Sequence, residues 1–300
     1  AQDCGGFTSR AAELIGWTSL MVFFCMIVVM GGVKRGIERA VTAMMPGIVL
    51  ILLVLIGYSI VDGRFADGFN FLFKPDFSEL STDGVIVALG HAFFTLSRAS
   101  GTMMAYGAYV PREISIARTG IIIGIADTAI ALMAGLAIFP LVFHYELEVT
   151  AGPGLIFLTL PIAFGEVPMG PFFGTLFFIM LFLAAFTSAI SLLEPTVAML
   201  MERFSLTRLR AVTGAGLVLW VCALPTVFSF NLWQEVRLIR SGVFAEKTIF
   251  DLIDYLTANI LLPLGGLLTA IFAAWIINRA ASREEYEARF GKAYRRGMCT

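Results

Sequence analysis

The sequence predicts an all-α, polytopic membrane protein, and three observations lead to that fold class. Hydrophobic residues make up 58% of the 300 residues and charged residues only 14%, whereas a soluble domain carries about a quarter charged residues. The apolar residues gather in seven stretches, each near the roughly 20 residues that a helix needs to cross a bilayer. One stretch is interrupted at residues 93–101 by hydroxyls, small residues and an arginine. Hydrocarbon cannot satisfy the backbone of such a break, so we expect a helix that is unwound there and faces protein, water or a bound solute.

The spans follow from the positions of the charged residues. The third stretch contains Arg98, the fourth contains Asp127, and the other five contain no charge. We expect one transmembrane domain, residues 1–300, with spans at about 14–33, 40–61, 84–111, 119–143, 167–193, 211–234 and 255–278. Glu194-Pro195 directly follows the fifth span and is expected to mark the end of its helix.

Two further segments are expected to lie outside the bilayer. Residues 149–165 are apolar but rich in Gly and Pro, which favours an extracellular helical hairpin over another crossing. Residues 279–300 alternate Arg and Glu at helical spacing and are expected to form a solvated cytoplasmic tail.

The distribution of Lys and Arg predicts the orientation in the cell (inner) membrane. With seven crossings, one side collects 14 of these residues and the other collects 6. The richer side is expected to be cytoplasmic, which places the start of the chain outside and its end in the cytoplasm. A chain that begins outside without Met suggests that earlier helices are missing.

Composition and motifs argue against several classes of function. The net charge of −1 lacks the basic footprint of a nucleic-acid-binding protein. The four cysteines are scattered without ligand spacing, so neither a metal site nor a disulfide is indicated. The chain contains no zinc-protease, nucleophile-elbow or phosphate-loop motif. We therefore expect neither an enzyme nor a bound cofactor.

Three polar residues within the spans are candidates for function. Arg98 and Asp127 each cost about 3 kcal/mol at a helix centre, so the functional interpretation is favoured, with a mutual salt bridge as the alternative. His91 lies one helical turn before Thr95 and is either a core histidine or part of the broken segment. Unwound helices near the midplane form the binding sites of many secondary transporters.

A second candidate site lies in the fifth span. Ala184, Thr187 and Ser188 follow one another at spacing i, i+3 and i+4, which places two hydroxyls and a small residue on one helix face. Hydroxyl and carbonyl oxygens suit a hard cation such as Na⁺. On these residues alone, helix packing with hydroxyls bonded to the preceding turn is the favoured interpretation.

Several motifs, taken in order and spacing, resemble the neurotransmitter:sodium symporter family in its bacterial amino-acid branch. They are Gly36-Ile37-Glu38-Arg39 with Met45-Pro46, the run from Phe71 to Phe77, Phe93 to Ser97 with Tyr106-Gly107-Ala108-Tyr109, Ala151-Gly152-Pro153-Gly154-Leu155 with Thr159-Leu160-Pro161, and Thr187-Ser188-Ala189-Ile190 with Glu194-Pro195. The resemblance covers nearly the whole chain. It implies a fragment containing about the fourth to tenth helices of a fold built from two inverted repeats of five helices.

The resemblance also implies roles for individual residues. One sodium site would use Ala184, Thr187 and Ser188, and the other would use Thr95 and Asp127. The substrate pocket would use Phe94, Thr95, Ser97 and Leu192, with Phe94 and Asp254 forming part of the outer gate. The family context thereby reverses the packing interpretation of the fifth span.

The chain departs from the family pattern around the break. Arg98 and Ser100 replace residues that are usually apolar or bulky, so both are expected to shape the substrate pocket. His91 stands where chloride-dependent relatives have a glutamine. Asp127 stands where many members have an asparagine, and its carboxylate could replace chloride. His91 and Asp127 are therefore the chloride-site equivalents.

The resemblance implies Na⁺-coupled import of an amino acid or similar small zwitterion by alternating access. One alternative is a proton-coupled transporter that uses Asp127 and His91. Another is a non-transporting membrane sensor or scaffold of the same fold. The expected partners are a small-molecule substrate, Na⁺ and the lipid bilayer, without nucleic acid.

Overall fold

The computed structural model describes residues 10–74, 77–79, 81–97, 101–107, 114–146, 154–166, 168–239 and 244–276. Among these residues every regular element is a helix and none is a strand, which confirms the all-α fold class. Six helices of the described part are long and apolar enough to cross a membrane. They are Ala11–Met30, Val33–Val61, Arg118–His144, Gly170–Phe204, Arg208–Ser229 and Ile249–Ile276. The third expected span is divided between two shorter helices, and over the residues that the structure describes neither of them is long enough to cross.

The chain forms two compact units, which are described separately. Unit 1 consists of residues 1–79 and 130–253, and unit 2 consists of residues 80–129 and 254–300. The described elements of unit 1 are α2 (Ala11–Met30), the π-helix η1 (Val33–Ile37), α3 (Glu38–Asp62), α4 (Phe65–Phe73), the short 3₁₀-helix η2 (Phe77–Glu79), the second half of α7 (Ile116–His144), η3 (Leu155–Thr159), α8 (Leu160–Glu166), α9 (Gly170–Phe204), α10 (Arg208–Ser229) and most of α11 (Ile249–Tyr255). Those of unit 2 are α5 (Thr82–Thr95), α6 (Thr102–Gly107), the first half of α7, η5 (Leu256–Leu261), α12 (Leu262–Ile271) and η6 (Phe272–Ile276).

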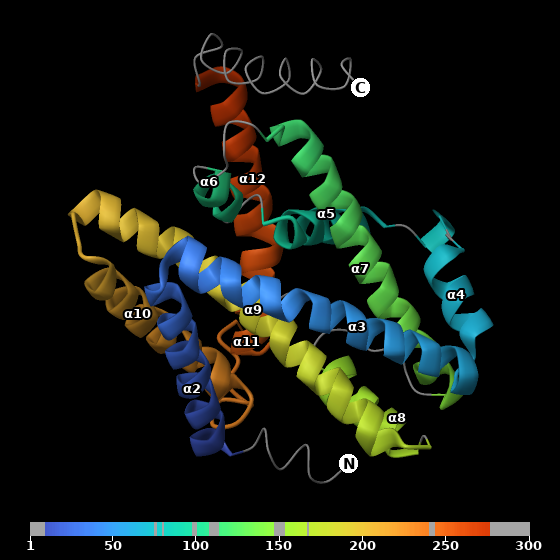
Figure 1. Ribbon diagram of the computed structural model, residues 1–300. Helices are drawn as coiled ribbons and strands as arrows, with labels where there is room; N and C mark the ends of the chain where they lie inside the picture. The colour runs from blue at the N-terminus through green and yellow to red at the C-terminus, as the bar shows by residue number, and fades with distance from the viewer. Residues whose placement is uncertain are drawn as a thin grey trace, which may run out of the picture. The chain divides into compact units, whose positions relative to one another are not determined.

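The long helix α9 is the centre of unit 1, and α2, α3, α8 and α10 pack against it (Figure 1). The core between α3, α7, α8 and α9 is apolar and includes Leu52, Leu55, Leu141, Leu160 and Phe177. At its edge Tyr58 stacks on Phe173 with ring centroids 3.8 Å apart. The Tyr58 hydroxyl donates to the Pro168 carbonyl at 2.9 Å. Many large apolar side chains of the long helices remain exposed, as expected where lipid rather than water surrounds them.

The helix α9 does not end at Glu194-Pro195, so that expectation was wrong. The helix continues through Pro195 to Phe204. Proline removes one backbone donor and bends a helix, but membrane helices tolerate this because neighbouring groups satisfy the freed carbonyl. Glu194 is therefore an interior residue of a long helix, buried against its neighbours.

Part of the expected extracellular hairpin is helical. Its residues 155–165 form η3 and most of α8, and α8 packs against α9. Residues 149–153 and the expected tail at 279–300 lie outside the described residues.

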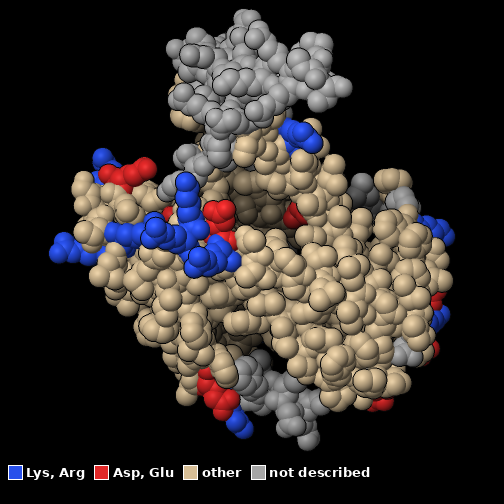
Figure 2. Space-filling model, in the orientation of Figure 1, with Lys and Arg blue, Asp and Glu red and all other residues tan. Residues whose placement is uncertain are grey.

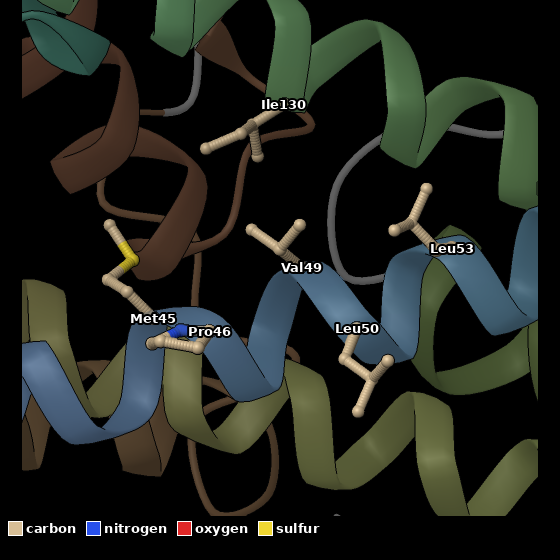
Figure 3. A pocket seen from close by; sticks show the side chains of 6 residues that line it. All are labelled: Met45, Pro46, Val49, Leu50, Leu53 and Ile130. Atoms are coloured by element: carbon tan, nitrogen blue, oxygen red, sulfur yellow. The ribbon is translucent and has the colours of Figure 1, made fainter.

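An apolar groove of about 570 Å³ lies between α3 and the second half of α7 in unit 1. Its lining residues are Met45, Pro46, Val49, Leu50, Leu53 and Ile130. Figure 3 shows Val49 and Leu53 pointing from α3 toward α7, from which Ile130 points back. None of these six side chains has an oxygen that could bind a cation, and none of them is a predicted site residue.

Candidate functional site

The break expected at residues 93–101 is present in unit 2. The helix α5 begins after Ser81, whose Oγ accepts a hydrogen bond from the Gly84 amide at 3.0 Å, and ends at Thr95. The Ser97 amide then donates to the Phe94 carbonyl at 3.0 Å, which is a three-residue bond in place of a helical four-residue bond. Ser97 has a left-handed φ of 50°. Helical structure resumes at Thr102 in α6, so the backbone leaves the helix where the sequence predicted.

The predicted substrate residues of unit 2 surround this break. Phe94 is exposed at 55% of its surface, and Thr95 and Ser97 are half-buried. The Thr95 hydroxyl points back along the helix, 3.5 Å from the Ala92 carbonyl. Arg98 and Ser100 lie outside the described residues.

The predicted ion and gate residues of unit 2 occupy three helices. His91 is exposed on α5, Asp127 is half-buried on α7, and Asp254 is exposed on α11. No hydrogen bond joins these three side chains among the described residues. Their roles in chloride replacement, sodium binding and gating remain predictions.

Two glycines allow α5 to lie close against the last helices, and the sequence had not indicated the role of one of them, Gly90. A Cβ on Gly90 would lie 2.4 Å from the Ala258 carbonyl oxygen. A Cβ on Gly266 would lie 2.5 Å from the ring of Phe93. The backbone at Ala258 approaches Gly90 and the ring of Phe93 approaches Gly266, so α5 packs closely against the last helices just before the break. Small residues at membrane helix contacts are the general signal that could have identified Gly90.

The second predicted site lies on α9 in unit 1. Thr187 is only 8% exposed, and its hydroxyl donates to the Ala184 carbonyl at 2.9 Å. Ser191 repeats this pattern by donating to the Thr187 carbonyl at 2.9 Å. Ser188, also expected at this sodium site, and Leu192, expected at the substrate pocket, are both exposed.

The α9 geometry contains features of both interpretations of these residues, helix packing and sodium binding. The hydroxyl bonds back to the helix, as in ordinary packing. The same bond places the Thr187 oxygen beside the Ala184 carbonyl oxygen, and two adjacent oxygens are part of what a hard cation requires. The structure therefore brings Ala184 and Thr187 together within unit 1 and Phe94, Thr95 and Ser97 together within unit 2.

A buried ion pair close to the α9 site was also missed. Glu194 has no exposed surface, and its Oε2 accepts a hydrogen bond from Nη2 of Arg208 at 2.5 Å. The same guanidinium donates twice to the Val29 carbonyl, from Nε at 2.9 Å and from Nη2 at 2.6 Å. This arrangement, called here the Glu194–Arg208 clamp, ties α9, α10 and α2 together. The signal in the sequence was a carboxylate inside an apolar run, which requires a partner.

Comparisons with known proteins identify the family. The family model described as "Sodium:neurotransmitter symporter family" matches residues 3–292. A sodium-dependent transporter of Haemophilus influenzae is 34% identical over 274 residues, which are 91% of this chain and 58% of the relative. The sodium-dependent transporter YhdH of Bacillus subtilis is 33% identical over 270 residues, with 89% and 58% covered. This chain thus spans little more than half the length of these relatives.

A solved structure shows the same fold. The crystal structure of MhsT in complex with L-phenylalanine superposes with a TM-score of 0.85 and 34% sequence identity, over 96% of this chain and 67% of that chain. The family match extends over nearly the whole sequence. The end of α5 at Thr95 lies within the run from Phe93 to Ser97, one of the motifs that carried the resemblance. This chain belongs to the sodium:neurotransmitter symporter family.

Proposed function

We propose that the protein containing this chain is a Na⁺-coupled symporter that imports an amino acid or similar small zwitterion by alternating access. The observation that carries the proposal is the break between α5 and α6, where Thr95 ends one helix and Ser97 turns into the left-handed region. A helix that ends inside a membrane span presents backbone carbonyls and a terminal dipole to a bound solute. Secondary transporters use such ends to hold ions and zwitterions.

Na⁺ would bind on α9 through the Ala184 carbonyl and the hydroxyls of Thr187 and Ser188. The 2.9 Å contact between the first two oxygens supports this assignment. Thr95 and Asp127 would contribute to a second sodium site, and the carboxylate of Asp127 would replace chloride. Binding requires that the Thr187 hydroxyl rotate, since its proton now faces the Ala184 oxygen that would also coordinate the cation.

The substrate would bind at the break, and the role of Leu192 in the same pocket, which the resemblance implies, stays a prediction. Exposed Phe94 would cover it, as the aromatic lid implied by the resemblance, and Asp254 would close the outer gate. The complex of the relative MhsT contains L-phenylalanine, so this amino acid is the first probe to use. Arg98 and Ser100 would adjust the pocket to the natural substrate.

The orientation is part of the proposal. The end of unit 1 that carries the α2–α3 and α9–α10 connections would be cytoplasmic, since it carries a cluster of Lys and Arg. The protein would lie in the inner membrane with the seven spans expected from the sequence.

The test is uptake of labelled L-phenylalanine by the full-length protein in proteoliposomes with an inward Na⁺ gradient. Thr187→Ala removes a proposed ligand, so we expect the Na⁺ concentration for half-maximal uptake to rise at least tenfold. Thr175→Ala is the control, because Thr175 lies on the same helix and its hydroxyl also donates to a carbonyl of the preceding turn, that of Pro171. Equal effects of the two substitutions would refute the α9 sodium site. Uptake that follows a proton gradient and ignores Na⁺ would favour the proton-coupled alternative.

A further inference from the structure

One end of unit 1 carries a concentration of positive charge that has no part in the proposed binding of Na⁺ and substrate. The connections between α2 and α3 and between α9 and α10 meet there. The six cationic side chains at this end are called here the basic corner, and the same end carries three carboxylates. The cations are Lys34, Arg35, Arg39, Arg203, Arg208 and Arg210, and the carboxylates are Glu38, Glu194 and Glu202. Figure 2 shows Lys and Arg side chains gathered over this end of the unit.

The basic corner is held in place by the Glu194–Arg208 clamp. Arg208 binds Glu194 on α9 and the Val29 carbonyl on α2, so one cation and one carboxylate neutralise each other inside the unit. The other five cations and the other two carboxylates are exposed. The exposed charge at this end of unit 1 is therefore net positive, and the clamp holds α2, α9 and α10 together there.

Two exposed apolar side chains lie among these cations. Phe204 ends α9 and is 63% exposed, and Leu209 lies in the first turn of α10 and is 62% exposed. They are neighbours in sequence of Arg203 and Arg210. A short connection joins the helices, with Ser205 in the left-handed region at a φ of 52°. Both helices are long enough to span a membrane, so their ends lie near the boundary between acyl chains and headgroups.

We infer that the basic corner binds the headgroups of anionic phospholipids of the phosphatidylglycerol type. Arg39, Arg203 and Arg210 contact the phosphates, while Phe204 and Leu209 enter the acyl boundary beside them. Cations near an anionic bilayer surface attract its lipids, and neighbouring apolar side chains add the buried area that interfacial binding requires. A free phosphate ion would use the cations but would gain nothing from the two apolar side chains.

The experiment counts lipids bound to the protein. The full chain is purified in a neutral detergent, titrated with phosphatidylglycerol or phosphatidylcholine, and analysed by native mass spectrometry. We expect phosphatidylglycerol to bind in preference to phosphatidylcholine. Arg203→Gln with Arg210→Gln should weaken phosphatidylglycerol binding about 25-fold, because each surface cation contributes about fivefold. Arg203→Lys with Arg210→Lys keeps the charge and should retain binding within about threefold.

Control variants test whether binding occurs at the basic corner and whether the bound phosphate belongs to a lipid or is a free ion. Arg237→Gln with Lys247→Gln neutralises two cations beyond the other end of α10 and should leave lipid binding unchanged. Phe204→Ser with Leu209→Ser should weaken phosphatidylglycerol binding but leave binding of inorganic phosphate unaltered. The inference is overturned if the two pairs of Gln substitutions act equally, or if inorganic phosphate at millimolar concentration displaces the lipid. It is also overturned if both lipids bind alike.

Discussion

The Glu194–Arg208 clamp gives the sharpest prediction about stability. Arg208→Met removes the guanidinium but keeps an unbranched side chain, and so leaves the carboxylate of Glu194 buried without its cation. The second oxygen of that carboxylate, Oε1, already has no hydrogen-bond partner among the described residues. The two bonds to the Val29 carbonyl are lost as well.

The magnitude follows from this burial. Removing one partner of a buried ion pair costs about 3–5 kcal/mol, because an uncompensated charge remains inside. The side chain of Arg208 is 24% exposed, so water reaches the carboxylate once the arginine is gone. We therefore expect the free energy of unfolding to fall by about 3 kcal/mol, at the lower end of the range.

A double substitution separates the charge effect from lost packing. In Arg208→Met with Glu194→Leu, both charges are removed and the site becomes apolar. Such replacements are often neutral or stabilising, so the double variant should be within about 1 kcal/mol of the parent. The assay is reversible unfolding in detergent mixed with SDS, followed by circular dichroism. A loss below about 1 kcal/mol for the single variant, or a double variant less stable than the single one, would refute the reasoning.

Two further predictions use the same assay. Gly90→Ala places a methyl group 2.4 Å from the Ala258 carbonyl oxygen and should lower the free energy of unfolding by about 1–3 kcal/mol. Gly120→Ala is the control, since its added Cβ meets nothing within 4 Å, and it should be neutral or slightly stabilising. Equal effects of the two substitutions would mean that α5 is not held by close approach. Tyr58→Phe removes the hydrogen bond to the Pro168 carbonyl but keeps the ring, so a loss of about 1 kcal/mol is expected, and an unchanged unfolding midpoint would show that this bond adds nothing.

The sequence predicted the features that depend on local chemistry. Hydroxyls and small residues between 93 and 101 are poor helix formers in an apolar span, and α5 ends there at Thr95. Spacing alone placed Ala184 and Thr187 one turn apart on one helix face, where their oxygens now meet. The family resemblance was also confirmed, because several motifs in the right order along the chain identify a family even when each motif alone is unspecific.

Features that depend on contacts between distant segments could not be predicted. The clamp joins Val29 to Arg208, which lie 179 residues apart, and no pattern in either segment identifies its partner. The prediction that α9 ends at Pro195 was wrong, because proline breaks helices in water but is tolerated as a kink within a membrane. The same limit applies to Gly90, whose role appears only when α5 meets η5.

The proposal of sodium coupling is tested most directly by a sodium titration of substrate binding at fixed pH. Labelled L-phenylalanine is bound to the full-length protein in detergent while Na⁺ replaces choline at constant ionic strength. The account predicts that binding is negligible in choline, rises with Na⁺ and saturates, and that the same titration in chloride and gluconate gives the same curve. Binding that is equally tight in choline, or that changes with pH but not with Na⁺, would contradict it.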